Sequence, residues 1–328
     1  MAKVVLGVAT SHTPQLNVPA SSWPSVFLEK DRTDPRLDYE ALLSSAKPGI
    51  AEELTPERMQ QHDDACQKAL DGLAAVLRQA SVDVVVALGD DQHEQFHDDN
   101  MPMFCVYYGD SLPMGTREGR GGGDRALGGM SRAYQAAERH QLTDGPKEYP
   151  ACPELGFQLI RSLTDAEFDI SVSRRLDPDV GLGHAFTFIY RRLLPDGMTP
   201  MVPVMLNTFY MPNAAPPDRC YDFGRALRSA IESWESDTRV AIIASGGLSH
   251  VIIDEDLDQA TLRAMLTKDS STLRGLPADR MKLGTSENRN WIAMAGAMEP
   301  MDMLLAEYIP CYRTPAGTGC GMGFAYWL

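Results

Sequence analysis

The 328-residue sequence lacks three features that define common classes of protein. It contains no apolar run of about 18 residues or more, which argues against a transmembrane helix. Its six cysteines form no Cys-x-x-Cys pair, so neither a zinc ribbon nor a dithiol redox motif is supported. Lysine and arginine total 30 against 45 acidic residues, and the formal net charge of −15 argues against a nucleic-acid-binding or membrane-binding surface.

The cysteine usage and the acidic charge also bear on the cellular compartment and on the groups that would bind a substrate. The first residues do not have the pattern of a signal peptide, and scattered thiols are typical of a reducing compartment, so we expect a cytoplasmic protein. In so acidic a chain, an anionic substrate would need a local positive charge from a metal ion or an arginine.

What the sequence does contain is an alternation of strand-like and helical segments. Runs rich in valine and isoleucine predict strands at residues 4–10, 81–89, 201–209 and 241–245. Helical spacing of apolar residues predicts helices at 56–80, 152–164, 216–235 and 287–308, the last with a break near Pro300. The alternation predicts an α/β fold, a single domain over residues 1–328 with a largely parallel or mixed central sheet flanked by helices.

A polar, glycine-rich region interrupts this alternation, and we interpret residues 95–150 as a loop-rich insertion. Its run REGRGGGD lacks the Gly-Lys-Ser/Thr end of a phosphate-binding loop.

Three segments end on histidine just after an apolar run. They are VVLGVATSH, VVVALGDDQH and AIIASGGLSH, which end on His12, His93 and His250. Because sites in parallel sheets gather beyond the carboxyl ends of the strands, we expect these three imidazoles to lie at one edge and to meet. No comparable context surrounds His62, His97 or His140, which we interpret as surface or structural residues.

The end of a strand can hold an imidazole rigidly towards a cleft, and a ferrous site of the two-histidine, one-carboxylate type needs two such imidazoles and one carboxylate on one face. A third histidine beside the metal could act as an acid and base near neutral pH. The spacing leaves the carboxylate open, and the candidates include Asp90, Asp91, Glu94 and Glu287.

Three motifs give the chain a resemblance to a known family. ATSHTP at 9–14, ASGGLSH at 244–250 and ENRNWIAMAGAM at 287–298 resemble the class III (LigB-type) extradiol ring-cleaving dioxygenases. The likeness covers most of the chain and is closest to the 3-O-methylgallate and gallate dioxygenases. It implies a LigB-like fold, a Fe(2+) cofactor with His12, His93 and Glu287 as ligands, and His250 as the acid and base.

The chain departs from the family pattern at two places. Where many relatives carry an active-site histidine, the stretch DPDVGLGHAF has valine. We expect His184 to supply a catalytic imidazole from a shifted position, with a structural role as the alternative. Where some relatives carry a Ser-Asn pair towards the substrate, TPAGTGCGMG has Thr318 at about that place. We expect Thr318 and Arg289 to contact the substrate, with a structural salt bridge as the alternative for Arg289.

The resemblance implies an enzyme that opens the ring of a catecholic or gallate-type aromatic acid with O2. We favour 3-O-methylgallate, with gallate, protocatechuate and other lignin-derived catechols as further candidates, and we expect a homodimer without a separate small subunit. Two alternatives stay open: a zinc-dependent hydrolase on the same metal site, and a non-catalytic, Memo-like binding protein.

Overall fold

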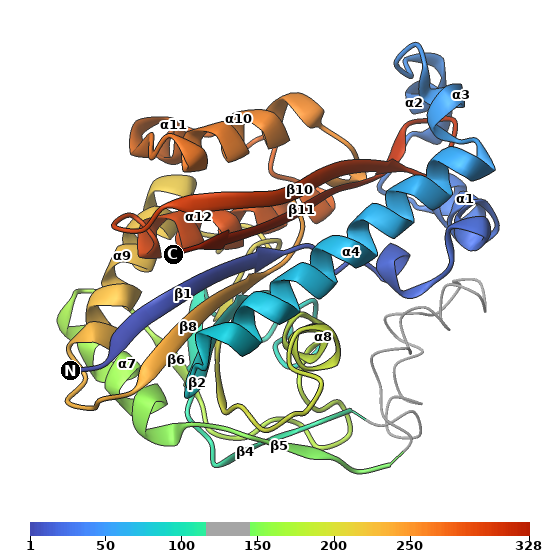
Figure 1. The fold of residues 1–328 in the computed structure, drawn as a ribbon. Coiled ribbons are helices and arrows are strands. Elements are labelled where there is room, and N and C mark those ends of the chain that lie inside the picture. Colours follow the sequence, from blue (N-terminus) through green and yellow to red (C-terminus); the bar gives the residue numbers. More distant parts are fainter. Residues whose placement is uncertain (116–144) are drawn as a thin grey trace.

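A computed structural model describes residues 1–115 and 145–328 of the chain (Figure 1). The glycine-rich run and much of the predicted insertion, residues 116–144, lie outside the described residues, as does His140. The insertion and the single-domain boundaries therefore stay predictions. Among the described residues, no helix combines the length and the apolarity needed to cross a membrane.

A mixed sheet forms the centre of the fold. Its strands follow the spatial order β10 (Met303–Tyr312), β11 (Thr318–Trp327), β1 (Lys3–Thr10), β8 (Arg239–Ser245), β2 (Val84–Gly89), β7 (Met201–Leu206), β3 (Phe104–Tyr107) and β6 (Ser171–Ser173). The ninth strand, β9 (His250–Ile252), pairs with β11. The neighbours β1, β8, β2 and β7 run parallel, whereas β11 and β3 pair antiparallel with β1 and β7. The prediction of an α/β fold with a largely parallel or mixed sheet is confirmed.

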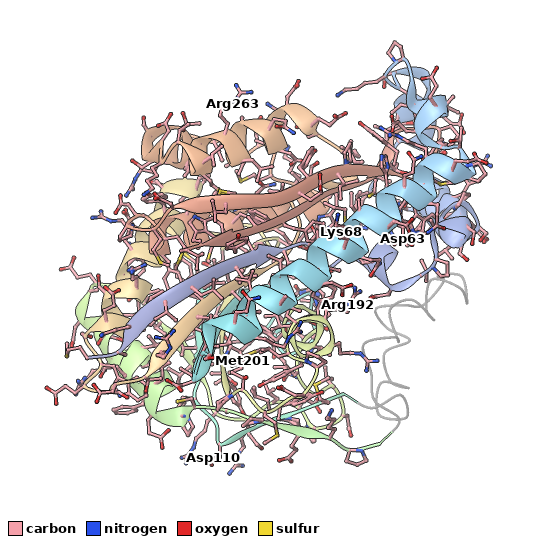
Figure 2. All side chains as sticks on the ribbon, in the orientation of Figure 1. Asp63, Lys68, Asp110, Arg192, Met201 and Arg263 are labelled. Atoms are coloured by element: carbon pink, nitrogen blue, oxygen red, sulfur yellow. The ribbon has the colours of Figure 1, made fainter. Side chains whose placement is uncertain are left out.

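Helices cover both faces of this sheet, because alternate side chains of its buried strands point to opposite sides. On one face, Val84 and Val86 join a core with α7 (Pro153–Asp165), α9 (Pro217–Glu232) and α12 (Asn288–Ala297). On the other, Val85 and Ala87 pack in a core with α4 (Pro56–Ala80) and α8 (His184–Arg192). Helix α4 runs diagonally across Figure 1, and Figure 2 labels Lys68, an exposed residue of this helix.

Shorter elements complete the described chain. They are the helices α1 (Trp23–Thr33), α2 (Tyr39–Ser44), α3 (Ile50–Glu53), α10 (Glu255–Leu266) and α11 (Ser270–Arg274), the 3-10 helices Pro14–Asn17, Ala20–Ser22 and Leu283–Glu287, and the paired strands β4 (Ser111–Pro113) and β5 (Glu148–Pro150).

One segment has the opposite structure to the one predicted. The helical interpretation of residues 287–308 is correct for α12, but residues 303–312 form β10. This strand pairs antiparallel with β11 along its whole length. Ladder pairing with the last strand of the chain outweighs the helical preference of its methionine and leucine residues.

Candidate metal centre

The carboxyl ends of three neighbouring parallel strands form the base of the site. Strands β1, β8 and β2 pair side by side, so their ends lie at one edge of the sheet. His12 comes two residues after β1, Asp90 directly follows β2, and the Gly246-Gly247 turn follows β8 and leads to His250. The sequence predicted that side chains would meet at this edge.

The Gly-Gly turn makes room for an acidic side chain. Gly246 has a φ of 154°, and a Cβ at this position would lie 3.1 Å from Glu287 Oε2 and 2.9 Å from Asn290 Nδ2. The Gly247 N–H donates to Glu287 Oε2 at 2.7 Å. Glu287 ends the 3-10 helix that precedes α12, so a rigid element and a backbone donor hold its carboxylate in place.

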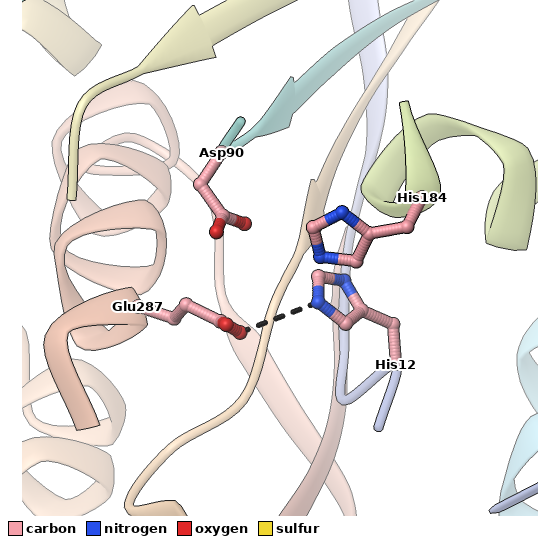
Figure 3. A group of neighbouring side chains, drawn as sticks. All are labelled: His12, Asp90, His184 and Glu287. Atoms are coloured by element: carbon pink, nitrogen blue, oxygen red, sulfur yellow. Dashed lines mark ion pairs between the residues drawn. The ribbon is translucent and has the colours of Figure 1, made fainter. Parts of the chain in front are cut away.

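Four side chains converge in this space, as Figure 3 shows: His12, Asp90, His184 and Glu287. Each offers one nitrogen or oxygen atom, and these atoms lie within 4.8 Å of one another. The two imidazole rings pack edge to face with centroids 4.7 Å apart. Two imidazoles and two carboxylates at these separations are a donor set that suits a divalent metal ion.

The hydrogen bonds of Ser245 fix the tautomer of His12. The Ser245 hydroxyl donates its single hydrogen to the Ala185 carbonyl at 2.6 Å, so towards His12 Nδ1, 3.0 Å away, it can only accept. His12 therefore carries its hydrogen on Nδ1 and presents a lone pair on Nε2. Burial lowers the pKa of His12 to about 3, which keeps the ring neutral. Nε2 lies 3.4 Å from Glu287 Oε2, so a lone pair faces a carboxylate and a cation between them would satisfy both.

Glu94 orients the second imidazole from behind. One of its carboxylate oxygens lies 2.8 Å from His184 Nδ1, and the other accepts the His184 backbone N–H at 2.9 Å. Burial works against protonation of His184, but the charge and hydrogen bond of Glu94 raise its pKa to about 10. With Nδ1 committed to Glu94, Nε2 is the ring atom that would face an ion, and it would have to give up the proton that this raised pKa implies.

Asp90 carries a buried oxygen that lacks a hydrogen-bond partner. The residue is 1% exposed, and its Oδ1 has no partner in the described chain. Its Oδ2 accepts a hydrogen bond from Gln92 Nε2 at 3.3 Å. Burial and then the nearby charge of Glu287 raise the pKa of Asp90 to about 7. An orphaned buried acceptor is costly without a proton or a cation, so this observation also fits a metal site.

Glu287 links the four-residue group to His250. Its Oε1 lies 3.1 Å from His250 Nε2. Burial opposes ionisation of Glu287, yet the charge and hydrogen bond of His250 and the hydrogen bond from the Gly247 N–H lower its pKa to about 2. Burial also opposes protonation of His250, but Glu287 raises the pKa of that imidazole. His250 therefore stands beside the centre with a nitrogen that can carry a proton.

The other residues predicted for the site lie in different surroundings. His93 is not in the four-residue group: its ring stacks on Tyr210 with centroids 3.9 Å apart, and its Nε2 lies 3.2 Å from Asp98. The Thr318 hydroxyl bonds with Asp31 and with Thr314.

Arg289 donates through Nε and Nη1 to the backbone carbonyls of Ala215, Thr208, Met281 and Ser286. A structural role for Arg289 accords with these contacts, although they are made to carbonyl groups and not to a salt-bridge partner.

Three residues around the centre were missed or left open by sequence reasoning. Asp90 was one of several open carboxylates, and neither the orienting role of Glu94 nor that of Ser245 was predicted. The available signal was position: Asp90 is the first residue after β2, and Ser245 is the last residue of β8.

A comparison with known protein families identifies the family of this chain. Residues 41–319 match the family described as the catalytic LigB subunit of aromatic ring-opening dioxygenase. The chain belongs to this family. The matched span includes Asp90, His184, His250 and Glu287, whereas His12 precedes it. The family resemblance expected from the motifs is confirmed.

Individual relatives are more distant. The chain is 28% identical over 186 residues to a 2,3-dihydroxyphenylpropionate/2,3-dihydroxicinnamic acid 1,2-dioxygenase of Comamonas testosteroni, an alignment that covers 57% of the chain and 49% of that relative. It is 34% identical over 151 residues to a gallate dioxygenase of Pseudomonas putida, which covers 42% of the chain and 43% of the relative. The chain thus spans about half the length, or less, of these relatives.

Proposed function

We propose that the protein is a ferrous-iron-dependent extradiol dioxygenase that opens a catecholic or gallate-type ring next to its diol. The observation that carries this proposal is the convergence of His12, Asp90, His184 and Glu287 at the carboxyl edge of a LigB-family sheet, with His250 beside them. The two relatives named above are a 2,3-dihydroxyphenylpropionate/2,3-dihydroxicinnamic acid 1,2-dioxygenase and a gallate dioxygenase.

The residues of the four-residue group would hold the ion in place. His12 contributes Nε2, whose lone pair is exposed by the Ser245 hydrogen bond, and Glu287 contributes a carboxylate fixed by the Gly247 N–H. A ferrous ion held there supplies Lewis acidity that favours loss of the diol protons, together with the redox chemistry that activates dioxygen. Burial of these side chains excludes water from the reacting groups.

His250 is the residue that moves protons in this proposal. Its Nε2 faces the centre from the side of Glu287, and its Nδ1 lies 3.2 Å from the Leu248 carbonyl, to which it can donate. The ring is therefore fixed with one nitrogen towards the space where a substrate hydroxyl would lie. It accepts a proton from that hydroxyl and later returns one to the cleaved product.

Several finer points stay predictions. We favour 3-O-methylgallate as substrate, and gallate, protocatechuate and other lignin-derived catechols remain candidates. Substrate contacts from Thr318 and Arg289 and a homodimeric assembly also remain predictions from the family resemblance.

Oxygen uptake tests the proposal directly. The protein is loaded with Fe(II) without oxygen, its iron content is measured, and oxygen uptake is recorded with protocatechuate, gallate, 3-O-methylgallate and 2,3-dihydroxyphenylpropionate. We expect at least one of them to be consumed with one O2 for each ring opened. His12→Ala protein, treated in the same way, is the matched control and should be inactive.

The same experiment separates the iron enzyme from a zinc hydrolase, because histidine and carboxylate donors also suit zinc. Zinc-loaded protein should take up no oxygen. If iron-containing protein takes up no oxygen with any of the phenolic acids, the dioxygenase proposal is wrong. If the zinc-loaded form then hydrolyses an ester or amide, the second candidate replaces it.

A further inference from the structure

The identity of the second imidazole at the metal centre is decided by the geometry of two histidines. The family resemblance implied His93 as a ligand and His184 as a catalytic residue. In the structure His184 lies in the four-residue group with His12, and His93 lies outside it.

Hydrogen bonds orient His184 as they orient His12. Ser245 occupies Nδ1 of His12, and Glu94 occupies Nδ1 of His184. Both rings are thereby turned so that Nε2 is the free atom, and Figure 3 shows them side by side, opposite the two carboxylates. A metal-binding histidine commonly donates its other ring N–H to a carboxylate or another oxygen, which fixes its tautomer and orientation.

A second observation indicates that a cation belongs between these groups. Asp90 Oδ1 is buried without a hydrogen-bond partner and belongs to the same four-residue group. Asp90 and Glu287 bring two carboxylates into this small buried space. Such an arrangement of carboxylates is unfavourable when both are ionised and becomes favourable around a divalent ion.

His93 is half-buried, and its Nε2, although buried, makes no hydrogen bond in the described chain. Its side chain is 31% exposed, its ring lies almost parallel to Tyr210 with an interplanar angle of 11°, and its Nε2 is close to the exposed Asp98. The backbone at His93 has a φ of 59°, in a turn held by Asp91.

We infer that His184, in place of His93, supplies the second imidazole ligand of the metal ion, and that Glu94 positions it. The set His12, His184 and Glu287 then provides the two imidazoles and one carboxylate of a ferrous site. Only the identity of the metal as iron rests on the proposed function.

Metal binding, measured apart from activity, tests this assignment. Metal-free protein is titrated with Co²⁺, and the affinity is measured by calorimetry together with the visible absorption spectrum of the bound ion. Wild-type protein and His93→Ala protein should bind one Co²⁺ with the same dissociation constant within about twofold. His184→Ala protein should bind more than tenfold more weakly, with a changed spectrum.

Glu94→Gln provides a second variant in case His184→Ala fails to fold. The amide cannot replace the carboxylate behind His184, so Co²⁺ affinity should fall by roughly 10- to 100-fold while the ligands themselves are intact. Circular dichroism and thermal unfolding of each metal-free variant show whether the fold is retained.

The outcomes separate this inference from the proposed function. If His93→Ala protein loses Co²⁺ while His184→Ala and Glu94→Gln proteins keep wild-type affinity, the ligand assignment is wrong, whatever the oxygen-uptake result. If the assignment holds and no phenolic acid supports oxygen uptake, the proposed function fails and the metal site stands.

Discussion

Three contacts, one from the backbone and two from the ring, fix the position of the single residue His250. Its backbone N–H donates to Thr285 Oγ1 at 3.3 Å, its Nδ1 faces the Leu248 carbonyl, and its Nε2 faces Glu287. The preceding Ser249 is fully buried and donates through both its N–H and its hydroxyl to Asp258, at 2.8 and 2.5 Å. The order Ser-His in this motif therefore has a physical reason. The serine anchors the turn, and the histidine that follows it faces the site.

Replacing His250 by glutamine should separate metal binding from turnover. Glutamine fills a similar space but cannot exchange a proton near neutral pH, so we expect kcat to fall by roughly 10²- to 10⁴-fold. Metal content and Co²⁺ affinity should remain close to the wild-type values, because His250 lies outside the four-residue group. Metal analysis and oxygen-uptake kinetics on the same preparation measure both quantities. A variant that loses its metal and regains the wild-type rate when metal is restored would show that His250 is not the acid and base.

Single residues also show what the sequence could and could not predict about the site. His12, Glu287 and His250 were found from strand ends and motifs, and the structure places them together. The segment after β2 was harder, because Asp90 and His93 are only three positions apart. Asp91 accepts backbone N–H groups from Glu94, Gln95 and Phe96, and the turn built in this way carries His93 away from Asp90. Such a turn depends on hydrogen bonds that residue spacing does not reveal.

At the scale of elements, the packing of two helices helps to set the position of Glu287 in the candidate metal centre. Helices α9 and α12 approach each other through Gly224 and Gly296, where an added Cβ would overlap the backbone oxygens of Ala293 and Tyr221. Helix α12 begins directly after Glu287, so the position of this helix also sets the position of a proposed ligand.

Glycine-to-alanine changes in two helices should have opposite effects on stability. Gly224→Ala places a methyl group against rigid backbone, and we expect a loss of about 1–3 kcal/mol in the free energy of unfolding. Gly72→Ala in α4 is the matched control, because no described atom beyond the adjacent residues and the backbone of this helix lies within 4 Å of its added Cβ. There alanine should stabilise the helix by about 0.5–1 kcal/mol. Urea unfolding of both variants measures the two changes, and equal effects would contradict the packing argument.

Elements with strong local signals were predicted well, whereas β10, whose local signal is helical, was not. Helix α4 has Thr55 as its N-cap and Pro56 in its first turn, and its predicted bounds of 56–80 are correct. Strand β10 was interpreted as helix because its residues favour a helix locally. Its structure depends on the ladder with β11, which a window along the sequence does not contain.

At the scale of the whole molecule, the metal centre joins distant parts of the chain. His12 follows β1, Asp90 follows β2, His184 opens α8 on one face of the sheet, and Glu287 precedes α12 on the other. An ion bound by these residues connects both helical layers with the edge of the sheet. Because the unfolded chain does not bring these groups together, the ion binds the folded state preferentially.

Metal binding should therefore raise the stability of the whole fold. At a free metal concentration of 100 times the dissociation constant, linkage predicts a gain of about 2.7 kcal/mol in the free energy of unfolding. In a chain of this size that gain corresponds to a rise of a few degrees in Tm. Differential scanning calorimetry of metal-free protein, with Co²⁺ and then with excess chelator, should show the rise and its reversal. His93→Ala protein should show the same rise as wild type, whereas His12→Ala protein should show none. An equal rise in the His12→Ala protein would mean that the stabilising ion binds elsewhere on the molecule.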